Sequence, residues 1–96
     1  MSLRSSLKIR DKRREQRRLT TGRVHVRCSD PQALEIEGRL IDISPSGFRM
    51  IHTCMSLAAG QLVEFSHQEA EGRARVMWNR VLAERVETGF FVLATS

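Results

Sequence analysis

A carboxylate, a hydroxyl and a glycine stand close together in residues 42–47, Asp-Ile-Ser-Pro-Ser-Gly. Asp42 and Ser44 are two residues apart, so an extended backbone points both side chains to the same side. Gly47 has no side chain, which permits a positive φ and lets a ligand or another backbone approach closely. Together with exposed backbone amides, these groups predict a small polar site that binds a partner.

A cluster of arginines forms the second group of residues suited to binding chemistry. Residues 12–18 read Lys-Arg-Arg-Glu-Gln-Arg-Arg, which gives two pairs with four-residue spacing, Arg13/Arg17 and Arg14/Arg18. A guanidinium pairs bidentately with a phosphate or with the O6/N7 edge of guanine, and it stacks on flat rings. A lysine ammonium supplies only the charge. The cluster therefore indicates planar recognition of phosphate or of a base edge, and either arginine pair fits.

The positive charge of the chain is concentrated near its N-terminus. Residues 1–27 contain ten Lys or Arg and two acidic residues, a net charge of +8, whereas the remainder has six basic and nine acidic residues, a net of −3. We therefore expect a flexible basic arm over residues 1–21 and a mildly acidic domain over residues 22–96. Such an arm binds an anion or serves as a solvated charged segment.

Short segments with alternating apolar and polar residues run through the domain, a pattern typical of strands with one buried face. The expected strands cover residues 22–28, 34–43, 47–52, 62–65, 73–78 and 90–93. Residues 81–84 fit a strand or a helix, and we expect a turn at 87–89 and loops at 53–61 and 66–72. Many short strands with frequent turn signals predict an all-β fold, a small antiparallel barrel or sandwich.

The alternation also predicts which side chains form the core. They are Val24, Val26, Ile36, Leu40, Phe48, Met50, Val63, Phe65, Val76, Trp78, Phe90 and Val92. With 96 residues the chain has the length of one domain.

Several functional classes are disfavoured by the sequence. No apolar run approaches the roughly 20 residues of a membrane span, and the basic N-terminus lacks the apolar segment of a signal peptide, so we expect a cytoplasmic protein. His25, His52 and His67 share no ligand spacing, which argues against a metal site. Ser44 lacks a nucleophile elbow, so we expect no enzymatic activity and no cofactor.

The two motifs, in this order, resemble the PilZ domain family. The arginine arm precedes an antiparallel barrel, and the Asp-x-Ser-x-x-Gly turn of residues 42–47 lies on that barrel. The segments Val76-Met77-Trp78 and Gly89-Phe90-Phe91-Val92 add to the likeness, which extends from about Arg13 to Leu93. The resemblance implies a six- or seven-stranded barrel of the split-barrel type.

The resemblance also implies a ligand, the bacterial second messenger cyclic di-GMP, which contains two guanines and two phosphates. By position, Arg14 and Arg18 correspond to the paired arginines of the family, because an apolar residue, here Leu19, usually follows the second arginine. Arg13 corresponds to the adjacent arginine that helps to hold a second, stacked ligand molecule. Asp42, Ser44 and Gly47 complete the implied site. The ligand would order the arm against the barrel and present a new surface to an effector protein.

Two other functions fit parts of the sequence. A nucleic-acid-binding module would use the basic arm, although the acidic domain and the scarcity of aromatic residues for base stacking argue against it. A PilZ-like interaction domain that binds no ligand is the other alternative. The sequence leaves open the regulated process, the effector, the number of bound ligand molecules, the oligomeric state and the choice between the two arginine pairs.

Overall fold

Seven strands and no helix make up residues 16–96, the part of the chain that the computed structural model describes. Every strand pairing is antiparallel. Within this part of the chain there is accordingly no helix long and apolar enough to cross a membrane. The strands are β1 (Arg18–Leu19), β2 (Arg23–Cys28), β3 (Leu34–Ser44), β4 (Gly47–His52), β5 (Leu62–His67), β6 (Ala70–Leu82) and β7 (Arg85–Thr95).

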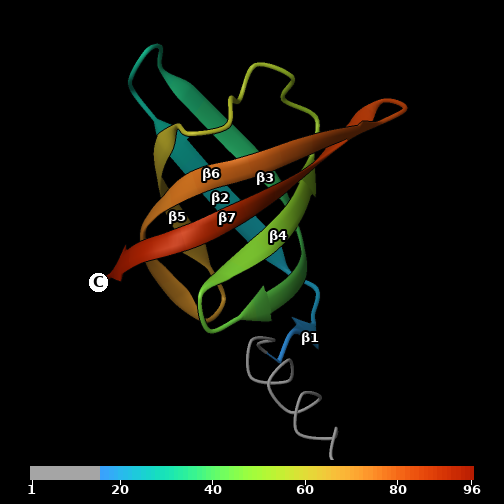
Figure 1. Ribbon diagram of the computed structural model, residues 1–96, viewed down its shortest axis with the longest axis vertical. Helices are drawn as coiled ribbons and strands as arrows, with labels where there is room; N and C mark the ends of the chain where they lie inside the picture. The colour runs from blue at the N-terminus through green and yellow to red at the C-terminus, as the bar shows by residue number, and fades with distance from the viewer. Residues whose placement is uncertain (1–15) are drawn as a thin grey trace, which may run out of the picture.

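Six of the strands close into a barrel. The sheet order is β1-β3-β2-β5-β6-β7-β4. The last strand, β4, also pairs with β3, which closes the sheet into a barrel and leaves β1 as an extra strand beside β3. The long strand β3 makes this closure possible, because its first half pairs with β2 and its second half with β4. Figure 1 shows the closed barrel, with β1 and the β3–β4 turn at the same end. The predicted small antiparallel barrel is confirmed.

The strand β1 was not expected, since residues 1–20 show no strand periodicity. Its two residues pair with Ile43 and Asp42 of β3, and Thr20 N–H donates to the carbonyl of Ile41. The rest of the expected arm, residues 1–15, lies outside the described residues. The described part of the arm is thus held beside the Asp-x-Ser turn.

The turn predicted at residues 87–89 is wrong, and of the two alternatives for residues 81–84 the strand is correct for Val81 and Leu82, which end β6. The turn lies at Ala83 and Glu84, and residues 87–89, expected to turn, belong to the continuous strand β7. Polar Glu87 and Thr88 resemble turn residues, but both are buried and hydrogen-bonded to side chains of other strands. The β6–β7 hairpin therefore extends well past the barrel (Figure 1).

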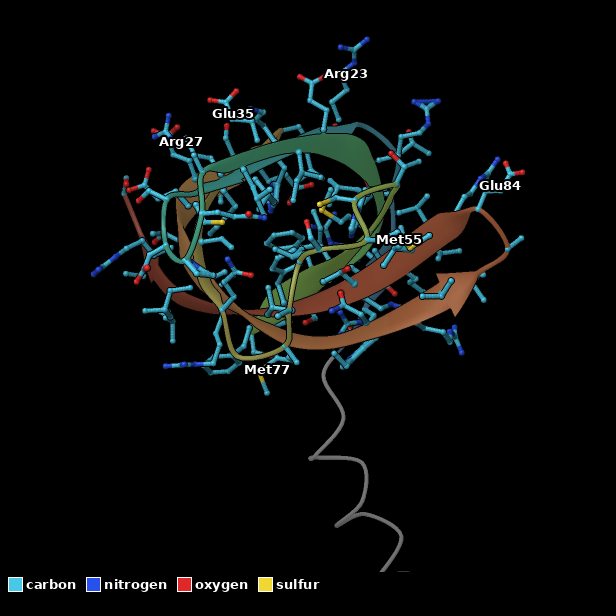
Figure 2. All side chains as sticks on the ribbon, turned by 90° about the horizontal axis from the view of Figure 1, so that it is seen from above. Arg23, Arg27, Glu35, Met55, Met77 and Glu84 are labelled. Atoms are coloured by element: carbon cyan, nitrogen blue, oxygen red, sulfur yellow. The ribbon has the colours of Figure 1, made fainter. Side chains whose placement is uncertain are left out.

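The hydrophobic core follows the predicted alternation with two exceptions. Val92 is only partly buried, and Trp78 is 39% exposed. Leu57 joins the core from the aperiodic loop between β4 and β5 and is 4% exposed. Viewed from above, charged side chains such as Arg23, Arg27 and Glu35 point outward around the barrel (Figure 2).

Trp78 leaves the core because β6 contains an irregularity. Val76 pairs with Phe90 and Trp78 with Gly89, so Met77 is an extra residue in β6. An extra residue of this kind, a β-bulge, reverses the face of the side chains after it. Trp78 therefore points to the outer face, where Met77 also lies (Figure 2).

A chain of buried hydrogen bonds holds the β4–β5 loop to the barrel. Cys54 N–H donates to His52 Nδ1 at 3.0 Å, and His52 Nε2 lies 2.7 Å from Thr88 Oγ1. The backbone amide is only a donor, so His52 is neutral with its proton on Nε2. Thr88 then donates to Asn79 Oδ1 at 2.6 Å, and Asn79 Nδ2 donates to the carbonyl of Leu57 at 2.9 Å.

Because His52 is part of these hydrogen bonds in its neutral form, the stability of the fold depends on pH. Burial lowers the pKa of His52 below its ordinary value of 6.5. Below pH 6.5 the unfolded chain therefore binds the proton more readily than the native state, and the free energy of unfolding falls as the pH decreases toward the lowered pKa. We expect urea denaturation to show lower stability at pH 5.5 than at pH 7.5. His52→Gln should reduce this difference. An equal difference in the variant would assign the effect to His67, whose pKa burial also lowers.

Candidate ligand-binding site

A β-bulge in β3 places Asp42 on the outer face of the barrel. Leu40 pairs with Met50 in the core, but Asp42 pairs with Arg49, which is adjacent to Met50 and points the opposite way. Ile41 is the extra residue. Ser44 follows Asp42 onto the same face and pairs with Gly47 across the two-residue turn formed by Pro45 and Ser46.

Asp42 is almost completely enclosed by arginines. Arg49 Nε lies 3.0 Å from both carboxylate oxygens, Arg49 Nη2 donates to Oδ2, and Arg17 Nη2 lies 3.2 Å from Oδ1. Only 2% of Asp42 is exposed. Burial by itself raises the pKa of this carboxyl, but the hydrogen bonds from Arg49 and Arg17 outweigh it, and the pKa lies below its ordinary value of 3.8. Asp42 is therefore an anion at neutral pH.

Ser44 and Gly47 have different structural roles at this turn. Ser44 Oγ accepts a hydrogen bond from Arg17 Nη1 at 3.2 Å and donates to the carbonyl of Gly47 at 3.4 Å. Among the described glycines a positive φ occurs at Gly22 and Gly60 but not at Gly47. A Cβ on Gly47 would lie 1.9 Å from the carbonyl oxygen of Phe90. A glycine is required here because β4 and β7 approach closely, and the alternative reason, a positive φ, is wrong.

The two described arginines of the predicted cluster point in different directions. Arg17 contacts Asp42 and Ser44, whereas Arg18 pairs with Glu69 in the β5–β6 turn, with Nη2 2.6 Å from Oε1. Adjacent residues of an extended chain face opposite sides, so the two guanidinium groups cannot both reach Asp42 in this arrangement. Arg13 and Arg14 lie outside the described residues.

An ion-pair chain that no local sequence pattern predicts extends from Asp42 across the sheet. Arg49 Nη1 pairs with Glu87 Oε2 at 2.9 Å, and Arg80 Nη2 pairs with Glu87 Oε1 at 2.8 Å. Glu87 is 5% exposed. In the sequence, the only indication of this ion-pair chain is that Arg49 interrupts the apolar run of residues 48–51 and so faces away from the core. Its partners depend on the pairing of β4 with β7.

Strand pairing also brings an aromatic side chain to the site. Leu19, Asp42, Arg49, Gly89 and Trp78 are successive partners across β1, β3, β4, β7 and β6. Cross-strand partners share a face. The indole of Trp78 lies over Gly89, where a Cβ would be 2.4 Å from ring atom Cε2.

Phe91, 44% exposed, lies beside this row as the partner of Gly47. Together with Trp78 it gives the outer face two accessible aromatic rings. The expectation of few rings available for stacking was therefore wrong at this surface.

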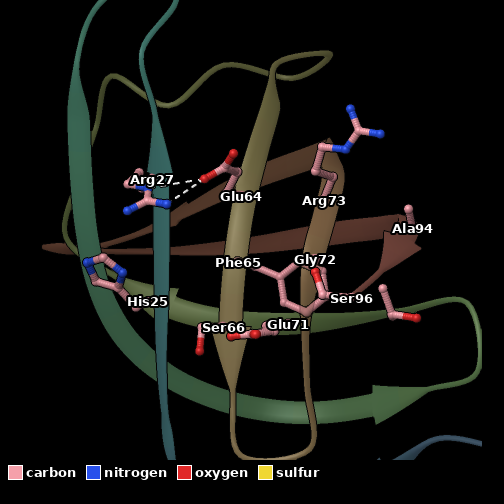
Figure 3. A pocket seen from close by; sticks show the side chains of 11 residues that line it. His25, Arg27, Glu64, Phe65, Ser66, Glu71, Gly72, Arg73, Ala94 and Ser96 are labelled. Carbon is pink, nitrogen blue, oxygen red and sulfur yellow. Dashed lines mark hydrogen bonds and ion pairs between the residues drawn. The ribbon is translucent and has the colours of Figure 1, made fainter.

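A hollow away from Asp42 lies on the outer face of β2, β5 and β6 (Figure 3). It has a volume of about 620 Å³, and within it Arg27 donates to Glu64 at 2.6 Å. Glu71 adds another carboxylate. Its positive and negative groups are balanced, so it suits a dianion less well than the arginine-rich face around Asp42.

The geometry does not support hydrolytic chemistry. His52 points to the inside of the barrel and is engaged by Thr88 and Cys54, while Ser44 is on the outer face. No group of three His, Cys, Asp or Glu side chains suited to a metal ion occurs in residues 16–96. The outer face around Asp42 carries a buried carboxylate paired with two arginines, a hydroxyl, further guanidinium groups and a flat ring. These are the chemical groups that suit a ligand with hydrogen-bond donors, negative charge and aromatic surface.

Comparison with protein families gives one match: the model of the PilZ domain matches residues 11–92, most of the chain. No curated protein matches the sequence. The matched residues include the arginine cluster, the Asp-x-Ser-x-x-Gly turn and all seven strands of the sheet except the end of β7.

Proposed function

We propose that this chain, which belongs to the PilZ domain family, is a receptor for cyclic di-GMP that binds its ligand between the basic N-terminal segment and the outer face of the barrel. PilZ domains are a known family of cyclic di-GMP receptors, acting as binding and adaptor modules. In our proposal Arg14 and Arg18 bind phosphate and guanine, Arg13 holds a second ligand molecule, and Asp42, Ser44 and Gly47 form the barrel half of the site.

One observation carries the proposal: a guanidinium of the arginine cluster reaches the carboxylate of the turn. Arg17 Nη2 lies 3.2 Å from Asp42 Oδ1, and β1 pairs directly with Asp42 and Ile43. The two motifs, 24 residues apart between Arg18 and Asp42, therefore meet at one surface. Among residues 16–96 the side chain of Arg18 pairs only with Glu69, in an exposed ion pair that stabilises little and leaves the guanidinium available to a phosphate.

The chemistry of the outer face fits guanine. A carboxylate accepts hydrogen bonds from guanine N1–H and N2–H, and an arginine donates to O6 and N7. Trp78 lies over Gly89, the partner of Arg49, so the indole is in the same cross-strand row as Asp42 and a ligand that extends along this row from Asp42 reaches it. We propose that ordering of the N-terminal segment, rather than catalysis, passes the signal to a partner protein.

Binding of single-stranded nucleic acid is the second candidate, favoured by the exposed rings of Trp78 and Phe91 beside several arginines. Binding of nucleic acid differs from binding of cyclic di-GMP in that it does not require Asp42. Contacts with phosphates and stacking of bases need cations and aromatic rings only.

Calorimetric titration with cyclic di-GMP tests the proposal. We expect binding in the micromolar range or tighter, and we expect Arg14→Ala and Arg18→Ala each to weaken it about tenfold or more, since a bidentate arginine contact contributes about 1–3 kcal/mol. Trp78 is the single tryptophan, so its fluorescence should change on binding.

Arg23→Ala is the matched control. Arg23 is exposed on β2, outside the proposed site, and its loss removes the same charge. If all three variants bind equally well, the assigned arginines are wrong. If single-stranded DNA displaces the ligand at similar concentrations, the second candidate replaces the first, whereas displacement by GTP at similar concentrations would show that the site does not select the cyclic dinucleotide.

A further inference from the structure

The carboxylate of Asp42 is closed to a ligand in this structure, because only 2% of the residue is exposed. The single N–H of Arg49 Nε is shared between both oxygens, Arg49 Nη2 donates to Oδ2, and Arg17 Nη2 covers Oδ1 at 3.2 Å. A guanine that pairs with Asp42 must therefore displace one of the two arginines.

Arg17 is the arginine that can leave. Arg49 is held by two carboxylates, because its Nη1 also pairs with Glu87, which is 5% exposed. Arg17 has only Asp42 and Ser44 as partners among the described residues, and its side chain is 39% exposed. It also precedes β1, a strand of two exposed residues that is held by a short ladder and is easily released.

The position of Arg17 relative to Arg18 also indicates that Arg17 is the arginine that leaves Asp42. The two side chains face opposite sides, with Arg18 directed to Glu69. To bring Arg18 to a ligand at Asp42, this segment has to turn or shift, and Arg17 then loses its contacts.

We infer that Arg17 is an intramolecular competitor, which occupies Asp42 and Ser44 in the ligand-free protein and sets the affinity by having to be displaced. The inference rests on the proposed function. Arg49, in contrast, is a positioning residue that keeps the carboxylate of Asp42 oriented toward the outer face.

The test compares Arg17→Ala and Arg17→Gln with Arg23→Ala in the full chain. Each variant removes one positive charge, so nonspecific attraction to the dianionic ligand falls equally. We expect both Arg17 variants to bind cyclic di-GMP about two- to fivefold more tightly than Arg23→Ala, because a competitor is removed. In the ligand-free protein, amide exchange at Thr20, which bonds to Ile41, should become faster in the Arg17 variants only.

Each result is decisive. If the wild type binds but the Arg17 variants bind equally or more weakly than Arg23→Ala, the competitor role is wrong and the proposed function stands. Weaker binding would assign Arg17, and hence the Arg13/Arg17 pair, to the ligand. If no form binds, the proposed function fails and the inference with it, whereas unchanged exchange at Thr20 would overturn the ligand-free contact of Arg17 and the competitor role with it, but not the proposed function.

Discussion

Replacing Asp42 by alanine is expected to weaken cyclic di-GMP binding by at least about thirtyfold, the largest loss of affinity for any single substitution in the barrel. Asp42 is the only carboxylate on the outer face that contacts both the N-terminal segment and β4 within residues 16–96. Removing one member of a buried, hydrogen-bonded charge pair costs about 2–5 kcal/mol in binding. Calorimetry of the purified variant measures the effect.

The same substitution changes stability, and this has to be separated from binding. Without Asp42, Arg49 keeps only Glu87 and Arg17 keeps only Ser44, so we expect a loss of about 1–3 kcal/mol in the free energy of unfolding. Asp42→Asn preserves the shape and some hydrogen bonds. It should be more stable than the alanine variant and bind equally poorly, because an amide presents an N–H₂ donor as well as an acceptor to guanine.

Glu37→Ala is the control for the loss of a carboxylate from β3. Glu37 is exposed and pairs across the sheet with His25, away from the site. We expect its affinity and stability to equal those of the wild type. A folded Asp42→Ala variant with normal affinity would remove the carboxylate from the proposed mechanism and favour a phosphate-only mode of binding.

Replacing Gly47 by alanine is expected to have the largest effect on the fold. The added Cβ would lie 1.9 Å from the carbonyl oxygen of Phe90, and this oxygen belongs to the backbone of β7, so it cannot move aside as a side chain can. The β4–β7 pairing, which holds β4 in the barrel, would have to separate locally. We expect a loss of about 3 kcal/mol or more in the free energy of unfolding, measured by urea denaturation.

Gly60→Ala provides a comparison in which space is not limiting. Gly60 has a φ of +92°, and no atom lies within 4 Å of its added Cβ. Its substitution should cost only about 1 kcal/mol through backbone strain. If Gly47→Ala retained wild-type stability but lost the ligand, clearance for the ligand would be the reason for a glycine at this position.

Local patterns in the sequence determined most of the architecture. Alternation in residues 22–28, 34–43 and 47–52 placed three strands within a residue or two of their observed bounds, because one face of each strand is buried along its length. The two motifs indicated the family, which the family match confirms. Alternation also predicted that Asp42 and Ser44 share a face, as they do.

The alternating pattern failed to predict the face of a side chain where one strand has an extra residue relative to its partner. Ile41 in β3 and Met77 in β6 are extra residues relative to their partners, and each reverses the face of the side chains after it. From the sequence, Trp78 continues the buried run of Ala74 and Val76. Only the pairing with β7 shows that it points outward, over Gly89.

The ion pairs of the site depend on tertiary structure for the same reason. Arg49 and Glu87 are 38 residues apart, and Arg17 and Ser44 are 27 apart, so no local pattern relates them. The sequence by itself determined which residue types the chain contributes to a binding surface and which strands present them. The strand pairings and the bulges at Ile41 and Met77 decided that Asp42, Arg49 and Trp78 share one outer row, because the face of a side chain depends on the register with the neighbouring strand and not on the strand alone.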